Sequence, residues 1–187
     1  MNNNKLNIIL IISGLVIASS AVAIVVYRRK KEITFVNWFG TSEFLANENR
    51  GTRNNNPGNI NQSNSNEWKG KLTEDIALSI PFFKKDDRFE MFISPEFGVA
   101  AMLELLKRYI ANGTNTVQKI ISKYAPANEN NTQKYINDVC NELKINANQT
   151  ISFEKNTMFA LAKAIIKFET SKILTETMFN NAWNIYN

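Results

Sequence analysis

The sequence predicts a mostly helical α+β domain that follows a single membrane-spanning helix near the N-terminus. Three observations indicate this fold class: a long apolar run at residues 6–27, four cations directly after it, and helical periodicity from residue 94 to the end. A length of 187 residues suits one folded domain with an appendage. Hydrophobic residues make up 44% of the chain, which is enough to form a core.

The N-terminal run reads LNIILIISGLVIASSAVAIVVY and contains no charged side chain. At 1.5 Å rise per residue, a helix of this length covers a hydrocarbon core of about 30 Å. The cations Arg28–Lys31 then resemble the flank of a stop-transfer anchor, and the positive-inside rule places the rest of the chain on the cytoplasmic side. A cleavable signal peptide ending near Ala21–Ala23 is the alternative. We expect a single-pass membrane protein with its anchor and basic flank at residues 1–31.

Charge and composition exclude several function classes. The formal net charge is +5, and Arg28–Lys31 contribute most of it, so no nucleic-acid partner is expected. The chain has one cysteine and no histidine, which excludes Ser-His-Asp and Cys-His catalysis and histidine-ligated zinc. We expect no metal and no organic cofactor. Any hydrolytic chemistry must depend on carboxylates.

Residues 32–49 form the expected connector, and residues 50–187 the expected domain. The domain opens with RGTRNNNPGNI, in which glycine, proline and asparagine prevent a long helix and Asn56–Asn59 favour a tight turn. The alternation in RFEMFI, residues 88–93, predicts a short strand, paired with part of residues 68–72. This is the small β element of the predicted fold.

Five helices are expected in the remainder of the domain. Each has an apolar stripe at helical spacing, and most have a capping residue or a stop signal. They are expected from Pro95 to the stop at Gly113, from near Thr116 to Pro126, from near Thr132 to Leu143, from Thr157 to Phe168, and from about Thr175 to Tyr186.

The run Arg50–Ile60 resembles the RGIRNNNPGNI signature of a family of phage virion-associated proteins, which look like peptidoglycan-degrading lytic transglycosylases of the lysozyme superfamily. The resemblance covers about residues 50–169. It continues in order through Trp68-Lys69-Gly70, Phe89 with Phe92, Ser94-Pro95-Glu96-Phe97-Gly98, Tyr109, Ile120-Ile121, Tyr124-Ala125-Pro126, Asn128 to Thr132, Tyr135-Ile136 and Ala164 to Glu169.

The chain departs from this family at one position of interest. Where the family tends to have Glu-Asn-Gly, this sequence has Glu169-Thr170-Ser171. A fainter likeness is to wall glucosaminidases, in which an Asn-Asn turn precedes an aromatic strand such as Phe89–Phe92. Both likenesses imply a lysozyme-like helical domain.

The resemblance implies a phage enzyme that cleaves the glycan strands of peptidoglycan, in the manner of a lytic transglycosylase, during entry or release. Together with the expected anchor at residues 1–31, this predicts a membrane-anchored enzyme in a virion membrane or a host inner membrane. The expected partners are peptidoglycan, the lipid membrane and other virion proteins. The alternative is a non-enzymatic virion protein with a lysozyme-like domain that binds the wall, and a third possibility is a bacterial inner-membrane protein with a cytoplasmic binding domain.

Cleavage of a glycosidic bond needs a proton donor, and a glutamate in an apolar pocket can hold its proton near neutral pH. Glu169 is the first candidate, because it ends the apolar helical run ALAKAIIKFE, which resembles the helix that carries the catalytic glutamate of soluble transglycosylases. Glu48 is the second, because it precedes the asparagine-rich turn. Both residues have the alternative role of ordinary surface carboxylates.

Amide and aromatic side chains are the expected contacts to the sugar. Amides can bond hydroxyl and N-acetyl groups or their own backbone, and aromatic rings can stack on sugars or pack in the core. The candidate substrate-binding residues are Asn54, Asn55, Asn56, Asn59, Trp68, Tyr124 and Tyr135.

Overall fold

The computed structural model describes residues 15–16, 25–26, 35–127 and 131–187. The chain divides into two units, Met1–Ile33 and Thr34–Asn187. In the first unit, strands β1 (Leu15–Val16) and β2 (Val25–Val26) pair in antiparallel fashion, with Leu15 opposite Val26 and Val16 opposite Val25.

The expected membrane-spanning helix at residues 6–27 was wrong where the structure describes this segment. Both described parts of the run are extended and pair with each other, which one continuous helix would not allow. Valine and isoleucine are β-branched, so the apolar run that suits a bilayer also has a high strand preference. The rest of the run lies outside the described residues. No described helix combines the length and apolar character needed to cross a bilayer, so the predicted single-pass membrane location is not supported.

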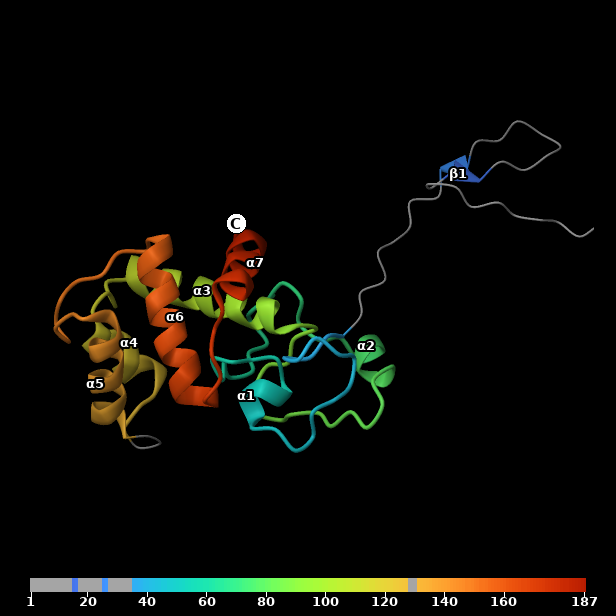
Figure 1. Cartoon of the computed structure of the whole chain (residues 1–187), viewed down its shortest axis with the longest axis horizontal. Coiled ribbons are helices and arrows are strands. Elements are labelled where there is room, and N and C mark those ends of the chain that lie inside the picture. Colours follow the sequence, from blue (N-terminus) through green and yellow to red (C-terminus); the bar gives the residue numbers. More distant parts are fainter. Residues whose placement is uncertain (1–14, 17–24, 27–34, 128–130) are drawn as a thin grey trace, which may run out of the picture. The chain divides into compact units, whose positions relative to one another are not determined.

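The described part of the second unit is mostly helical (Figure 1). Its helices are α1 (Arg50–Arg53), α2 (Glu74–Leu78), α3 (Pro95–Ala111), α4 (Val117–Tyr124), α5 (Thr132–Leu143), α6 (Lys155–Thr170) and α7 (Glu176–Tyr186). The five long helices confirm the five expected from the sequence, whereas the short α1 and α2 were not anticipated.

Capping residues explain where these helices begin. The side chains of Thr116 and Thr175 accept hydrogen bonds from the backbone N–H groups three residues ahead and so start α4 and α7. Asn131 does the same for α5, one residue before Thr132, near which the cap was expected. Helix α6 extends beyond the predicted Phe168 to Thr170, so that Glu169 lies in its last turn.

The expected small β element was wrong. Residues 35–127 and 131–187 contain isolated bridges but no strand. The backbone of residues 88–93 bonds in turn to residues 60–62, to residues 70–72, to Asn54 and to Val36, so no single partner continues the ladder. Glu90 to Ile93 are all buried, and the polar–apolar alternation therefore does not separate an inner from an outer face.

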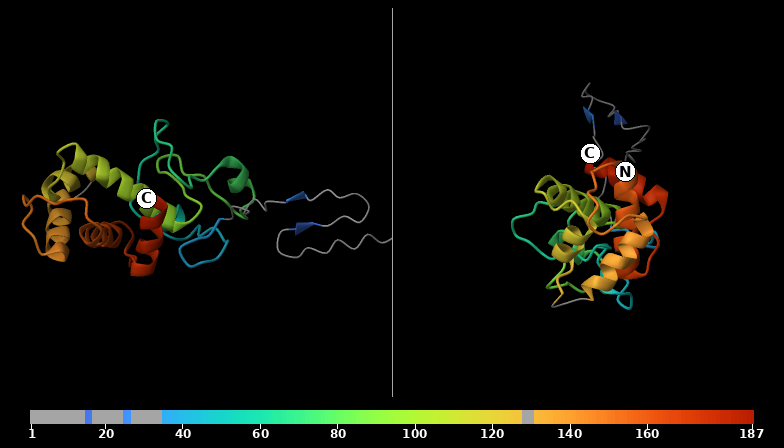
Figure 2. Two further views of the ribbon diagram at one scale, coloured as in Figure 1. Left: turned by 90° about the horizontal axis from the view of Figure 1, so that it is seen from above. Right: turned by 90° about the vertical axis from the view of Figure 1, so that its left-hand side faces the viewer.

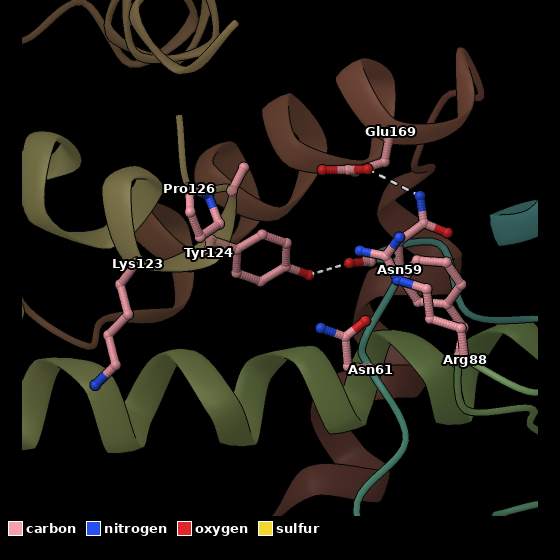
Figure 3. A pocket seen from close by; sticks show the side chains of 10 residues that line it. Asn59, Asn61, Arg88, Lys123, Tyr124, Pro126 and Glu169 are labelled. Atoms are coloured by element: carbon pink, nitrogen blue, oxygen red, sulfur yellow. Dashed lines mark hydrogen bonds between the residues drawn. The ribbon is translucent and has the colours of Figure 1, made fainter. Parts of the chain in front are cut away.

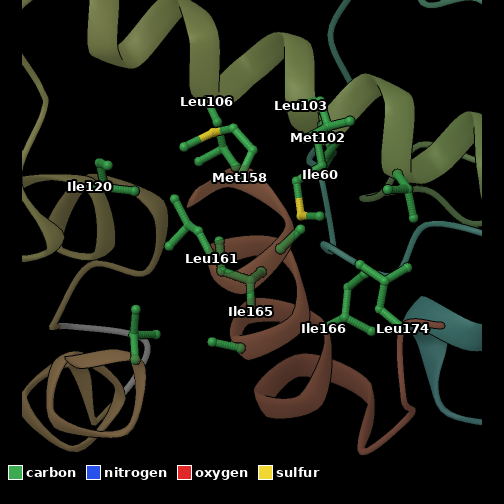
Figure 4. Close-up of a cluster of buried hydrophobic side chains, with 14 of the residues drawn as sticks. Ile60, Met102, Leu103, Leu106, Ile120, Met158, Leu161, Ile165, Ile166 and Leu174 are labelled. Atoms are coloured by element: carbon green, nitrogen blue, oxygen red, sulfur yellow. The ribbon is translucent and has the colours of Figure 1, made fainter. Parts of the chain in front are cut away.

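The core lies between the long helices. Helix α3 packs against α7 and α6, while α5 packs against α4 and α6. Figures 1 and 2 both place α4 and α5 at one end of this unit and α2 at the other. Figure 4 shows side chains from α3 and α6 meeting in the main cluster, which also includes Ile60 and Leu174. The fully buried members at this contact are Met102, Leu103, Leu106, Met158, Leu161 and Ile165.

Part of the expected connector belongs to the second unit. Phe35 and Phe44 are buried and form a smaller cluster with Ile80 and Met91. The Val36 N–H group donates to the Ile93 carbonyl at 2.7 Å. Residues before Arg50 therefore contribute to this fold.

Candidate active site

A cavity of about 540 Å³ opens where the end of α6, the end of α4 and two loops meet (Figure 3). Among the described residues that line it, Glu169 is the only carboxylic acid, and Arg88 and Lys123 are the cations. The full described lining is Gly58, Asn59, Asn61, Arg88, Phe89, Lys123, Tyr124, Ala125, Pro126 and Glu169. Polar and aromatic groups therefore surround a single acid.

The carboxyl group of Glu169 is held on the cavity wall. The Asn59 Nδ2 atom donates to Glu169 Oε2 at 2.8 Å, as Figure 3 shows. Burial raises the pKa of Glu169, and the hydrogen bond from Asn59 and the nearby Tyr135 hydroxyl only partly offset this rise. A carboxylic acid in such a site keeps its proton at a higher pH than an exposed glutamate does.

Two tyrosines lie close to this acid. The Tyr124 hydroxyl donates to the Gly58 carbonyl, and burial together with the Glu169 charge raises the pKa of Tyr124. Tyr135 stacks on Phe168 with a 3.7 Å centroid distance. Its buried hydroxyl has no well-formed hydrogen bond within the described part of the chain, yet it is near enough to Glu169 for each group to shift the other's pKa. The Tyr135 hydroxyl can therefore donate a hydrogen bond to the Glu169 carboxyl group.

The Asn-Pro-Gly-Asn turn has a geometric role in this arrangement. A Cβ atom on Gly58 would collide with the Tyr124 hydroxyl, so only glycine allows this contact. Asn59 has a φ of +48°, in the left-handed region that asparagine tolerates better than most residues. The turn therefore sets the backbone from which Asn59 reaches Glu169.

Sequence reasoning missed Asp86, which organises the other wall of the cavity. Asp86 is 3% exposed and pairs with Arg50 at 3.0 Å and Arg53 at 3.2 Å. Its second oxygen accepts from the backbone N–H groups of Arg88 and Phe89, both at 3.0 Å. These bonds fix the backbone of the two residues that line the cavity.

The pKa of Asp86 reflects these contacts. Burial by itself raises that pKa, but the hydrogen bonds from Asn54, Phe89 and Arg88 and the charge of Arg50 outweigh burial and lower the pKa to about 2. In the sequence, the two arginines Arg50 and Arg53 were the one sign that a buried carboxylate lies here. Asp86 was not predicted as their partner.

The consecutive asparagines have buried, structural positions. The Asn54 Nδ2 atom donates to Asp86 at 2.9 Å, and Asn55 Nδ2 donates to the Val36 and Phe92 carbonyls. Asn56 bonds the backbone of Ile60 and Glu90. Of the four asparagines proposed to bind substrate, only Asn59 is among the residues that line the cavity.

The remaining predicted residues divide between the cavity and other places. Tyr124 lines the cavity, and Tyr135 is buried behind Glu169. Trp68 is 5% exposed in the main core, with Arg108 over its ring. Glu48 pairs with Lys172 at 3.1 Å and does not line the cavity. Glu169, not Glu48, is therefore the acid that the fold brings together with the predicted polar groups.

Another cavity, of about 550 Å³, lies between α5 and α6 and also contains carboxylates. There Asp138 is paired with Lys134 and Glu142 with Lys163 at 3.0 Å. The hydrogen bond from Lys163 lowers the pKa of Glu142, which makes it a poor proton donor. Among the described residues, no group of three or more Cys, Asp or Glu side chains is arranged to hold a metal ion.

The chain is similar to Protein P5 of Pseudoalteromonas phage PM2, with 35% identity over 123 residues. The aligned part covers 64% of this chain and 70% of that protein. The chain belongs to the Protein P5 family. The phage relationship expected from the RGTRNNNPGNI run is thereby confirmed. No protein-family model matches the chain. The relative's name states no activity, so an activity has to be argued from the site.

Proposed function

We propose that this protein cleaves the glycan strands of peptidoglycan, with Glu169 as the proton donor. The observation that carries the proposal is the position of Glu169: an acid with a raised pKa on the wall of a cavity of about 540 Å³. Glycosidases place a glutamic acid in this kind of environment, because the leaving oxygen must receive a proton near neutral pH.

The hydrogen bond from Asn59 indicates which oxygen of Glu169 carries the acidic proton. Since Asn59 donates to Oε2 of Glu169, the acidic proton belongs on Oε1. In the proposed reaction, Oε1 gives its proton to the glycosidic oxygen while the bond from that oxygen to C1 of the muramyl sugar breaks. The carboxylate that forms is stabilised by the Asn59 amide and by the buried Tyr135 hydroxyl, which is near enough to turn toward it.

The second step of the proposed reaction follows from Glu169 being the only carboxylic acid among the described residues that line the cavity. Most glycosidases pair the acid with a second carboxylate, and the described lining of this cavity supplies none. A lytic transglycosylase does not need one, since the hydroxyl on C6 of the same sugar attacks C1 and Glu169 takes up its proton. The products are an anhydro sugar and a free hydroxyl end, and Glu169 is again protonated.

The family relationship supports a phage context for this chemistry. Phage proteins that open peptidoglycan act during entry or release, and we propose that this protein does so in association with other virion proteins. The proposal for the virion rests on the similarity to Protein P5 of phage PM2 and on the RGTRNNNPGNI run.

Release of soluble muropeptides from purified sacculi tests the proposal. The full chain should release them, and Glu169→Gln should lower the rate by about 100-fold or more, because a general acid contributes 10²–10⁴-fold. Glu48→Gln is the matched control, since Glu48 is another half-buried glutamate outside the cavity, and it should stay within about twofold of the wild type.

Mass spectrometry of the products separates the two mechanisms. Anhydromuramyl ends are expected, and reducing ends that incorporate oxygen from labelled water would identify a hydrolase. A folded wild-type chain that binds sacculi but releases nothing would overturn the catalytic proposal and favour a non-enzymatic wall-binding role.

A further inference from the structure

The short helix α1 is bonded to both walls of the cavity that contains Glu169. We propose that Asn49, the residue that caps α1, and Gly51 within it position Glu169 by fixing the last turn of α6. This inference rests on the proposed function and adds two positioning residues to it. Neither is among the described residues that line the cavity, and the sequence had placed Asn49 in the connector.

Asn49 bonds two helices at once. Its Oδ1 atom accepts from the Thr52 N–H group at 3.0 Å, which caps α1. Its Nδ2 atom donates to the Thr170 carbonyl at 2.9 Å, although 121 positions separate the two residues. Thr170 follows Glu169 and ends α6, where the helix carbonyls lack a partner within the helix. The bond from Asn49 therefore fixes the backbone next to the proposed acid.

Gly51 allows α1 to approach this turn closely. A Cβ atom on Gly51 would lie 2.7 Å from the Thr170 methyl carbon and 3.0 Å from Asn59 Oδ1, and the first distance is well inside van der Waals contact. Asn59 is the residue that donates to Glu169 at 2.8 Å. A side chain at residue 51 would therefore push on the turn that carries the acid and on the amide that holds it.

Helix α1 is also tied to the opposite wall. Arg50 pairs with Asp86 at 3.0 Å, and the other oxygen of Asp86 accepts from the N–H group of Phe89, which lines the cavity. The position of α1 thus sets where Glu169 lies relative to Phe89. Because a displacement of about 1 Å can cost about 100-fold in rate, contacts that fix this spacing can affect catalysis without touching the substrate.

The substitution Asn49→Ser separates the two bonds of Asn49. Serine caps a helix as well as asparagine does but is too short to reach Thr170, so the urea midpoint should stay close to that of the wild type. On soluble glycan strands, kcat should fall about tenfold while KM changes less than about twofold. Asn131→Ser makes the same change at the cap of α5 and is the matched control, with kcat within about twofold of the wild type.

The side-chain amide of Asn59 gives a readout that does not require activity. Because this amide donates to Glu169, its proton signals should shift with pH at the Glu169 midpoint. In Asn49→Ser the size of this shift should fall by about half or more, since Glu169 is no longer held against the amide. In Asn131→Ser it should stay as in the wild type.

Gly51→Ala tests the close approach of α1 to the end of α6. It should lower kcat about tenfold in the wild-type background. In a Thr170→Ser background the loss should be about threefold or less, because that change removes the methyl group that the new Cβ atom would meet first. Equal losses in the two backgrounds would overturn the role of Gly51.

The outcomes distinguish this inference from the proposed function. A wild-type kcat in Asn49→Ser, an unchanged Asn59 titration, or an equal loss in Asn131→Ser would overturn the role of Asn49 and leave glycan cleavage intact. A wild-type chain that cleaves no glycan would overturn the proposed function. In that case a reduced Asn59 titration in Asn49→Ser would still support the positioning of Glu169, and an unreduced one would overturn it.

Discussion

Replacing Asp86 with asparagine should destabilise the fold and disturb the cavity wall. One oxygen of Asp86 accepts from Arg50, Arg53 and Asn54, and the other accepts from two backbone N–H groups. In either orientation, the amide of Asp86→Asn would point its NH₂ group at N–H donors. The variant therefore loses a charge and also creates an unfavourable donor–donor contact.

The pKa of Asp86 gives the size of the charge effect. A fall from 3.8 to about 2, at about 1.4 kcal/mol per pKa unit, corresponds to about 2 kcal/mol of stability at pH 7. Because the pKa is lowered on folding, this stability is fully present above about pH 4 and is lost as the pH falls through about 2. The donor–donor contact adds to the loss, so we expect about 2–4 kcal/mol at pH 7.

Urea unfolding followed by circular dichroism at pH 7, 4 and 2.5 measures this effect. The free energy of unfolding of Asp86→Asn should lie below that of the wild type by the largest amount at pH 7, and the gap should narrow at pH 2.5. Asp87→Asn, a change at the exposed neighbouring residue, is the control and should stay within about 0.5 kcal/mol. A difference below 0.5 kcal/mol at pH 7, or a gap that widens in acid, would refute the reasoning.

Three further changes test separate parts of the site. Tyr135→Phe removes a hydroxyl that lowers the pKa of Glu169, so the alkaline limb of the pH–rate profile should move to higher pH. Thermal stability should change little. A shift of this limb to lower pH would contradict the reasoning. Asn59→Gly keeps the left-handed backbone but removes the amide that bonds Glu169. The alkaline limb of the pH–rate profile should again move to higher pH, and kcat should fall about tenfold. An unchanged pH–rate profile would exclude a positioning role for Asn59. Gly98→Ala places a Cβ atom against the Asn55 carbonyl and should lower the free energy of unfolding by about 2–3 kcal/mol, measured in urea; a neutral effect would show that α3 can move away.

The long helices could be predicted because their signals are local. Two helices were expected to begin near Thr116 and Thr175, and the side chains of these residues cap α4 and α7 by bonding the backbone. The end of α6 was placed two residues too early, because Glu169 and Thr170 carry no apolar signal. The pattern could not reveal that Thr170 is buried and bonds the Ile166 carbonyl.

The errors in the fold involve segments whose pattern fits two structures. The alternation of residues 88–93 was typical of a strand, but Glu90 to Ile93 are all buried, and the backbone of the segment bonds to several separate segments. The apolar run at residues 6–27 met the length criterion for a membrane helix, yet its described parts, Leu15–Val16 and Val25–Val26, are extended. Neither the burial of a segment nor its pairing partner can be read from local periodicity.

Candidate residues could be selected where side-chain chemistry limited the choice. With histidine absent, the proposed chemistry needs a carboxylate, and the fold brings Glu169 together with Asn59 and Tyr124. The position of Asp86 behind the cavity wall depends on contacts between segments distant in sequence, such as the pair Arg50–Asp86, which no local pattern encodes.

The central claim is that the cavity contains a glutamic acid that keeps its proton when exposed glutamates are ionised. Carbon-13 NMR titration of the side-chain carboxyl carbons, with the Glu169 signal assigned by its loss in Glu169→Gln, measures this directly. We predict that Glu169 titrates above its ordinary value of 4.5. A midpoint at or below 4.5 would contradict the claim, because Glu169 would then hold its proton no more strongly than an exposed glutamate does.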